Sequence, residues 1–385
     1  GVVAAAAFAA LALGAPGGAR GETMLGVFPG STFFPDRPGM EILQQLDQWT
    51  TSAGGVRTTF AGMFIGIEDA GTSCLADNPD PYDGSCYSVD EQLELAWTHG
   101  YTPLVKMGES AVPRTARAIA DGAADAGLVS WAQAFKKWYQ RGLSLGEQRF
   151  AFLAPLPEAN YCDQRQVTSA GAINCIVGSA HYTLDPESFR RAFRHIVDLF
   201  AAQGIPRAAT RWVFAPNGYT TPGDPDVAAY YPGDALVDAV GFSQYNQGYC
   251  YGSPYDYWLD PLVTPPAQEL FSQGIAKLRA IAPNRPLFVL QTGSSAQSPA
   301  RGAFDDERKN QWLRDAYAFF ADEGIAGVMY FNYPQPCDYE MFEPGSRRYD
   351  GYRDAAKGAG YAYASPASLR DRVLSPPGAG WRPDS

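Results

Sequence analysis

The 385-residue sequence is long enough for one large domain or two smaller ones, and a hydrophobic content of 46% argues against a disordered chain. A net charge of −11 argues against a nucleic acid or an anionic membrane as the partner. Aromatic residues make up 13% of the chain, which suits a surface that stacks on flat, weakly charged ligands such as sugars.

Residues 1–21 form an apolar run that is soon interrupted by Gly and Pro. The run is too short to span a bilayer comfortably, and it is typical of the apolar region and cleavage zone of a secretory signal. A lipoprotein signal or a simple membrane anchor is the alternative. We therefore expect a secreted, extracellular protein that acts as a monomer and has no membrane span in its mature chain.

An even number of cysteines fits this expectation, because disulfides form in exported proteins. The cysteines are Cys74, Cys86, Cys162, Cys175, Cys250 and Cys337. Many pairings are possible, and the short separations favour Cys74–Cys86 and Cys162–Cys175, which leaves Cys250–Cys337 as a long-range bond. With three histidines and no CxxC or HExxH motif, the chain is expected to hold neither a metal nor a cofactor.

Short, mostly apolar runs recur along the chain and predict strands that are buried on both faces. They cover residues 24–28, 56–65, 102–107, 149–156, 211–216, 237–245, 286–291 and 326–332. Stretches with helical periodicity lie between them, at residues 39–54, 88–100, 128–142, 185–204, 265–283 and 305–324. The helix predicted over 185–204 has the clearest ends, with Asp185 as the N-cap, Pro186 in the first turn and Gly204 as the C-cap.

Eight strands that alternate with helices predict an α/β fold, a (β/α)₈ TIM barrel with long βα loops stapled by disulfides, over residues 22–360. A doubly wound open sheet is the alternative, but it would normally carry a Gly-rich phosphate-binding turn, and the sequence has none. The Pro- and Gly-rich residues 361–385 are expected to form a tail that leaves the barrel or is disordered.

Barrel enzymes carry their chemistry at the C-terminal ends of the strands, which reduces the candidates to a few positions. The residues that end or follow strands three, four, six, seven and eight are, in that order, Glu109, Glu158, Tyr245 with Asn246, Gln291, and Phe331 with Asn332.

Several segments in order along the chain resemble the glycoside hydrolases of family 26, which are retaining barrels. YYPGDALVDAVGFSQYN (230–246) is similar to the run that leads into the family's sixth strand. PEAN (157–160) stands where the family has His-Glu-Met-Asn, and RPLFVLQTGSS (285–295) is similar to its seventh strand, which normally ends Glu-x-Gly. The chain departs from the family at Pro157, which replaces a His, at an Arg that is missing from the fourth strand, and at Gln291.

The resemblance implies an endo-acting hydrolase of a β-linked polysaccharide, such as mannan, xylan, mixed-linkage glucan or an exopolysaccharide. Retaining glycosidases need two carboxyl groups about 5–5.5 Å apart, one as proton donor and one as nucleophile. Glu158 would be the general acid/base, with its pKa raised by an apolar setting, and residue 291 would stand at the nucleophile position.

The resemblance also assigns binding roles around these two positions. Asn160 would hydrogen-bond the substrate, Tyr245 would hydrogen-bond the nucleophile, and Phe331 would lie near the sugar that is cleaved. The loop 245–258 is rich in aromatic residues, so Asn246 and Trp258 are expected to help build the cleft. By its position after the third strand, Glu109 would bind sugar hydroxyls or serve as a substitute carboxylate.

Gln291 leaves the reaction open, because an amide cannot attack as a carboxylate does. It would mark an engineered trap, a native glycan-binding protein without activity, or an enzyme that recruits another carboxylate. Glu109, Asp338 and Glu340 are the nearest substitutes by strand position. An inverting arrangement would place the second carboxyl group about 6.5–9.5 Å from Glu158.

Overall fold

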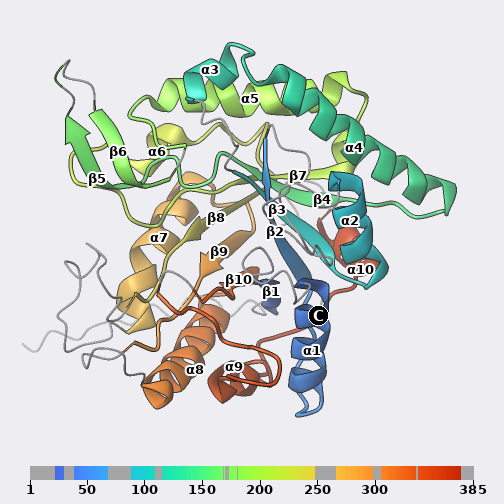
Figure 1. Ribbon diagram of the computed structural model, residues 1–385, viewed down its shortest axis with the longest axis vertical. Coiled ribbons are helices and arrows are strands. Elements are labelled where there is room, and N and C mark those ends of the chain that lie inside the picture. Colours follow the sequence, from blue (N-terminus) through green and yellow to red (C-terminus); the bar gives the residue numbers. More distant parts are fainter. Residues whose placement is uncertain are drawn as a thin grey trace, which may run out of the picture.

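The computed structural model describes residues 22–29, 39–67, 88–108, 115–167, 169, 173–179, 181–247, 266–297, 305–334 and 337–373. Within these ranges, parallel strands close a barrel in the order β1-β10-β9-β8-β7-β4-β3-β2 (Figure 1). The strands are β1 (Met24–Phe28), β2 (Phe60–Gly66), β3 (Thr102–Gly108), β4 (Ala151–Pro155), β7 (Thr210–Phe214), β8 (Ala239–Ser243), β9 (Leu287–Thr292) and β10 (Gly327–Phe331). The predicted barrel and its strands are therefore confirmed.

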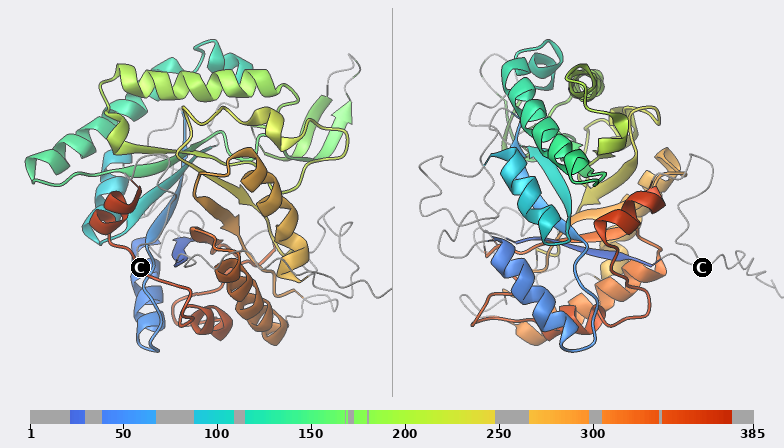
Figure 2. Two further views of the ribbon diagram at one scale, coloured as in Figure 1. Left: turned by 180° about the vertical axis from the view of Figure 1, so that it is seen from behind. Right: turned by 90° about the vertical axis from the view of Figure 1, so that its right-hand side faces the viewer.

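Helices cover the outside of this barrel, as the two further views in Figure 2 show. They are α1 (Gly39–Thr51), α2 (Val89–Thr98), α3 (Ala116–Ala120), α4 (Asp125–Ser144), α5 (Pro186–Ala202), α6 (Val227–Tyr230), α7 (Ala267–Ile281), α8 (Asp306–Asp322) and α9 (Asp350–Ala355). The predicted start of α5 is confirmed, because the Asp185 side chain accepts a hydrogen bond from the backbone N–H of Ser188. Gly204 follows this helix with a positive φ of 75°, a conformation that glycine adopts without strain.

Large aromatic side chains fill the inside of the barrel. The Phe60 ring packs edge-on against Phe152, with centroids 5.5 Å apart, and against Phe288, with centroids 5.7 Å apart. Edge-to-face contacts of this kind add to the stabilisation that burial provides. Because the interior is packed in this way, a ligand site of this barrel belongs at its mouth rather than along its axis.

The sequence predicted a bond between Cys162 and Cys175 but not the hairpin in which it lies. Its strands β5 (Cys162–Val167) and β6 (Ile173–Gly178) pair antiparallel, and the hairpin projects from the barrel (Figure 1). The Cys162–Cys175 bond joins the two strands, which confirms that predicted pair. Cys337 is also disulfide-bonded. Cys74, Cys86 and Cys250 lie outside the described residues, so the other two predicted pairs stay predictions.

The expectation of a tail that leaves the barrel after residue 360 is wrong for residues 361–373. Tyr361 forms a parallel bridge with Thr23 beside β1, and the helix α10 (Pro366–Val373) follows. Leu369 of this helix is fully buried in the apolar cluster that contains Phe150 and the interior side chains of the barrel. The segment therefore covers the N-terminal end of the barrel. Burial of Leu369 stabilises it, and the Pro- and Gly-rich composition of the surrounding sequence gave no sign of this contact. Residues 374–385 lie outside the described ranges.

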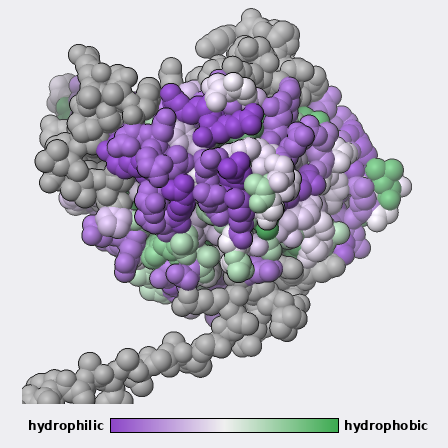
Figure 3. Space-filling model, turned by 90° about the horizontal axis from the view of Figure 1, so that it is seen from below, coloured by the Kyte–Doolittle hydropathy of each residue, from purple (hydrophilic) through white to green (hydrophobic). Residues whose placement is uncertain are grey.

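The outer surface is polar over much of its area. On the face drawn in Figure 3, hydrophilic residues predominate, and the hydrophobic ones form small, separate patches. No helix within the described ranges has the length and the apolar character required to cross a membrane.

Candidate active site

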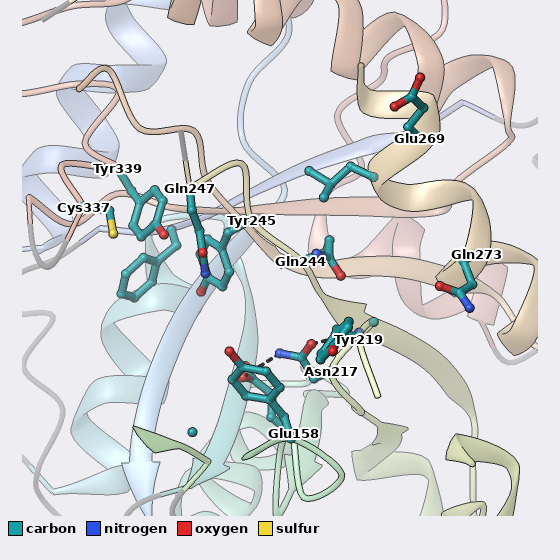
Figure 4. A pocket seen from close by; sticks show the side chains of 15 residues that line it. Glu158, Asn217, Tyr219, Gln244, Tyr245, Gln247, Glu269, Gln273, Cys337 and Tyr339 are labelled. Atoms are coloured by element: carbon teal, nitrogen blue, oxygen red, sulfur yellow. Dashed lines mark hydrogen bonds between the residues drawn. The ribbon is translucent and has the colours of Figure 1, made fainter. Parts of the chain in front are cut away.

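A pocket of about 470 Å³ opens at the C-terminal ends of the barrel strands. Aromatic, amide and carboxyl side chains line it: Tyr161, Tyr219, Tyr245, Phe331 and Tyr339, then Asn217, Gln244, Gln247 and Gln273, then Glu158 and Glu269. In Figure 4, Glu158 and Asn217 lie together, Tyr245 and Tyr339 stand apart from them, and Glu269 and Gln273 project from α7. This composition is typical of a site that orients a neutral polar ligand between aromatic faces.

A strained turn after β4 places Glu158 at this pocket. Leu156 has a φ of 51° and Glu158 a φ of 61°, in the left-handed region that residues other than glycine rarely adopt. Each such residue costs roughly 1–2 kcal/mol. Hydrogen bonds hold the turn, because the Glu158 N–H donates to the Ala215 carbonyl oxygen at 2.7 Å and the Ser179 hydroxyl donates to the Pro157 carbonyl oxygen at 2.9 Å.

A buried lysine connects the two predicted catalytic positions. Lys106, near the end of β3, is 1% exposed, and its Nζ lies 3.0 Å from Oε1 of Glu158. The same Nζ donates to the hydroxyl oxygen of Ser243 at 2.9 Å and to the side-chain oxygen of Gln291. Asn217 completes the surroundings, with its Nδ2 donating to Oε2 of Glu158 at 3.2 Å. Glu158 and Gln291 are therefore brought together, with Lys106 between them.

The electrostatics of Glu158 differ from the sequence expectation. Burial by itself would raise the pKa of this carboxyl, but the charge of Lys106 and hydrogen bonds from Ser243, Lys106 and Asn217 outweigh burial and hold the pKa below its usual value. The expected rise of the pKa is therefore wrong. The sequence could not reveal it, because Lys106 lies 52 residues before Glu158 in the chain.

Tyr245 and Phe331 both line the pocket. The Tyr245 side chain is hydrogen-bonded to that of Gln291, and burial raises the pKa of its hydroxyl well above the usual value. The ring of Tyr245 packs edge-on against Phe331, with centroids 5.8 Å apart, and lies 4.9 Å from the ring of Tyr339. Phe331 in turn stacks on Tyr333 with centroids 4.2 Å apart. Tyr245, Phe331 and Tyr339 form an aromatic wall of the pocket, and Tyr333 supports it from outside the lining.

Asn160 and Asn246 do not line the pocket. Both are 1% exposed. Asn160 holds a turn in place, because its Nδ2 donates to the carbonyl oxygens of Asn217 and Tyr219 and its Oδ1 accepts the N–H of Asn217. The Nδ2 of Asn246 donates to the Ser294 hydroxyl at 2.9 Å. The predicted contacts of these two asparagines with substrate are therefore not supported, and their position supports the pocket from behind. Glu109 and Trp258 lie outside the described residues.

Two of the proposed substitute carboxylates, Asp338 and Glu340, lie outside the lining of the pocket. Asp338 is paired with Arg347, and Arg347 Nη1 lies 2.5 Å from its Oδ2. Neither Asp338 nor Glu340 lines the pocket that contains Glu158. Glu269 does line it, although it comes from the exposed side of α7.

Sequence reasoning missed Lys106, Asn217 and Ser243. A usable signal existed for Lys106, since it is the charged residue in an otherwise apolar strand and lies two positions after the buried Leu104, on the same side of β3. Asn217 and Ser243 follow or end strands as the other candidates do, but their residue types alone indicate no particular chemistry. Among the described residues, no group of three His, Cys, Asp or Glu side chains could hold a metal ion.

Comparisons with known proteins agree with this architecture. No protein-family model matches the chain. The chain is 26% identical over 201 residues to Endoglucanase H of Acetivibrio thermocellus, a match that covers 52% of this chain and 18% of that protein. The chain therefore spans less than a fifth of the length of this curated relative.

Two solved structures share the fold over most of the chain. The catalytic domain of the GH26 endo-β-1,4-mannanase of Bacillus sp. JAMB-750 superimposes with a TM-score of 0.58 at 15% identity, covering 92% of this chain and 90% of that one. A modular endo-β-1,4-mannanase from Cellulomonas fimi superimposes with a TM-score of 0.57 at 15% identity, covering 90% of this chain and 74% of that one. Both similarities concern the arrangement of the barrel.

Proposed function

We propose that this chain is a glycoside hydrolase-like protein that binds a β-linked polysaccharide at the mouth of its barrel. One observation carries the proposal: the Lys106 ammonium group contacts the side chains of both Glu158 and Gln291, at the ends of β4 and β9. Glu158 lines a pocket that also has an aromatic wall. Aromatic faces stack on the apolar faces of sugar rings, and the amide side chains opposite them can bond sugar hydroxyls.

We further propose that the chain binds its glycan without forming a covalent intermediate. In a retaining glycosidase, one carboxylate attacks the anomeric carbon while a carboxylic acid gives its proton to the leaving oxygen. Gln291 lacks the nucleophilic oxygen, and the lowered pKa of Glu158 leaves that residue without the proton at neutral pH. The site therefore keeps the layout of a hydrolase but lacks both chemical groups in their active form.

Hydrolysis with inversion is a second candidate, favoured by one observation. An ionised Glu158 has the form that a general base needs to activate a water molecule. Such a mechanism also needs a carboxylic acid on the other side of the sugar, and Glu269 is the other carboxyl group among the described residues of the pocket lining.

Export of the protein is part of the same proposal. The apolar N-terminal segment and the disulfide bonds of Cys162, Cys175 and Cys337 support an oxidising compartment. A polysaccharide substrate would be met outside the cell, which agrees with this location.

Calorimetric titration with oligosaccharides of mannan, xylan, mixed-linkage glucan and an exopolysaccharide tests the proposal. We expect binding of at least one of them without release of reducing ends, and Phe331→Ala should weaken that binding by up to about tenfold because it removes one aromatic face. The exposed Leu145→Ala serves as the control that leaves binding unchanged. Absence of binding to every glycan would overturn the proposal, and release of reducing ends that depends on Glu158 would favour the inverting candidate.

A further inference from the structure

Lys106 uses its donors on three different parts of the site. An ammonium group has three N–H donors, and the acceptors here are Glu158 on the turn after β4, Ser243 at the end of β8 and Gln291 in β9. Burial lowers the pKa of this lysine and the charge of Glu158 opposes that effect. Because a buried ammonium without a counter-charge is strongly unfavourable, Lys106 requires one negative charge beside it.

The surroundings of residue 291 would suit a carboxylate. Gln291 is 6% exposed, its side-chain oxygen accepts from Lys106, and its side chain also bonds Tyr245. A hydroxyl group can donate or accept by rotating its hydrogen, so Tyr245 could donate to a carboxylate as readily as it pairs with the amide. Two donors that would stabilise a negative charge at position 291 are thus present around a neutral side chain.

The neighbouring groups add no charge to the cluster formed by Lys106, Glu158 and Gln291. Ser243 and Asn217 are neutral donors to Glu158. The hydroxyl groups of Tyr333 and Tyr339 lie near Tyr245, and burial raises the pKa of Tyr245 itself, so that it stays neutral over the working range. Among the described residues, the net charge of the cluster is therefore decided by Lys106, Glu158 and the side chain at position 291.

We propose, on the basis of the function proposed above, that Lys106 is a positioning residue that holds one negative charge at the site and that residue 291 decides how this charge is shared. With Gln291, Glu158 carries the charge alone and has no proton to donate. With a carboxylate at position 291, the two carboxyl groups would share one proton and one charge, because like charges at a common site cannot both ionise freely. A single substitution would then produce the acid and the nucleophile together.

Infrared difference spectroscopy of the full chain at pH 7, with ¹³C-labelled glutamate to assign the bands, tests this directly. The unsubstituted chain and Glu158→Gln should show the same carboxylic-acid region, since Glu158 is ionised. Gln291→Glu should gain the band of one protonated glutamate, and Gln291→Glu/Glu158→Gln should lose it again. A Gln291→Glu spectrum without that band, or a band that persists in the double variant, would overturn the role of Lys106.

A pH profile gives a second readout that a purely structural lysine would not move. In the Gln291→Glu background, hydrolysis of nitrophenyl β-cellobioside and β-mannobioside should follow a bell-shaped curve. Adding Lys106→Met should move the acidic limb of that curve upward by about one pH unit or more, because the cation no longer favours the ionised nucleophile. An unmoved limb would count against the proposal, and the infrared comparison decides the matter if Lys106→Met fails to fold.

The two proposals fail in different ways. A shared proton in Gln291→Glu, together with no glycan binding and no hydrolysis by any variant, would overturn the proposed function and leave the role of Lys106 intact. Hydrolysis by Gln291→Glu with both carboxyl groups ionised at pH 7 would overturn the role of Lys106 and leave the proposed function intact.

Discussion

Lys106 and Glu158 depend on each other for stability as well as for charge. Lys106 is 1% exposed and Glu158 is 20% exposed, so the pair lies largely out of water at the bottom of the pocket. Removing one member of a buried ion pair leaves an uncompensated charge, whereas removing both can be nearly neutral. The pair is therefore suited to a double-mutant cycle.

We expect Lys106→Met and Glu158→Gln each to lower the free energy of unfolding by about 3 kcal/mol, the low end for broken buried pairs because Glu158 keeps contact with solvent. The double variant should lose clearly less than the sum of the two, with a coupling of at least about 1 kcal/mol. Urea denaturation at pH 7 measures all three values. Losses that simply add would mean that the pair contributes no mutual stabilisation.

For single residues, the sequence indicated which residues lie at the site better than it indicated the contacts that their side chains make. Glu158, Gln291, Tyr245 and Phe331 could be predicted because each ends or follows a strand of a recognisable barrel. The properties of Glu158 could not, since its pKa depends on Lys106, a residue from another strand. The role of Asn160 could not be assigned either. A short polar side chain beside a catalytic position can hydrogen-bond a buried turn as well as it can hydrogen-bond a ligand.

Between elements, α8 and α9 pack closely against each other in the outer layer. An ideal Cβ on Gly351 would lie 2.1 Å from the backbone oxygen of Asn310, and the Gly351 N–H donates to Oδ1 of the same asparagine at 2.7 Å. The backbone of a helix cannot move aside as the end of a flexible side chain can. Glycine at this position therefore fixes the distance between the two helices.

We expect Gly351→Ala to lower the free energy of unfolding by about 1–3 kcal/mol, even though alanine is favoured over glycine in a helix by about 1 kcal/mol. Gly108→Ala is the matched control, because a Cβ there would meet no atom closer than 3.7 Å. Urea denaturation measures both changes in stability, provided that the dependence of the unfolding free energy on urea concentration is the same in all variants. A Gly351→Ala variant as stable as the unsubstituted chain would show that α9 can shift without a loss of stability.

The elements that the sequence predicted and those that it missed differ in length and in the origin of their stability. Apolar strands and long amphipathic helices are visible because their own periodicity determines which face is buried. The hairpin β5–β6 has one polar strand, CDQRQV, and is joined by Cys162–Cys175, and α3, α6, α9 and α10 have few turns each. Their formation depends on tertiary contacts such as the burial of Leu369, which local patterns do not contain.

Across the whole molecule, buried polar side chains connect the outer layer to the pocket. Lys309 of α8 is fully buried, and its Nζ donates to the carbonyl oxygens of Asp338 at 3.1 Å and Glu340 at 2.6 Å. Tyr330 of β10 donates to the carbonyl oxygen of Tyr339 at 2.7 Å. These bonds hold in place the segment from which Tyr339 reaches the pocket. The same residues therefore contribute both to the stability of the fold and to the shape of the site.

Lys309 should also make the stability of the fold depend on pH. Burial lowers its pKa to about 7, and the charge of Arg347 acts in the same direction, while Asp338, Glu340 and Asp306 oppose the shift. An unfolded lysine has a pKa of about 10.4. Between these two values the unfolded chain holds a proton that the folded chain has released, so the contribution of Lys309 to stability rises with pH. A neutral amine still has two N–H groups, enough for both carbonyl oxygens.

The free energy of unfolding of the unsubstituted chain minus that of Lys309→Met isolates this contribution from other titrating groups. We expect the difference to be constant below about pH 6 and to rise from pH 7 to pH 9 by up to about 1.4 kcal/mol per pH unit. Urea denaturation at closely spaced pH values measures it, and the flat region at low pH is the internal control. A difference that stays flat through pH 9 would mean that Lys309 remains charged in the folded chain, with the carboxyl groups of Asp338, Glu340 and Asp306 outweighing its burial.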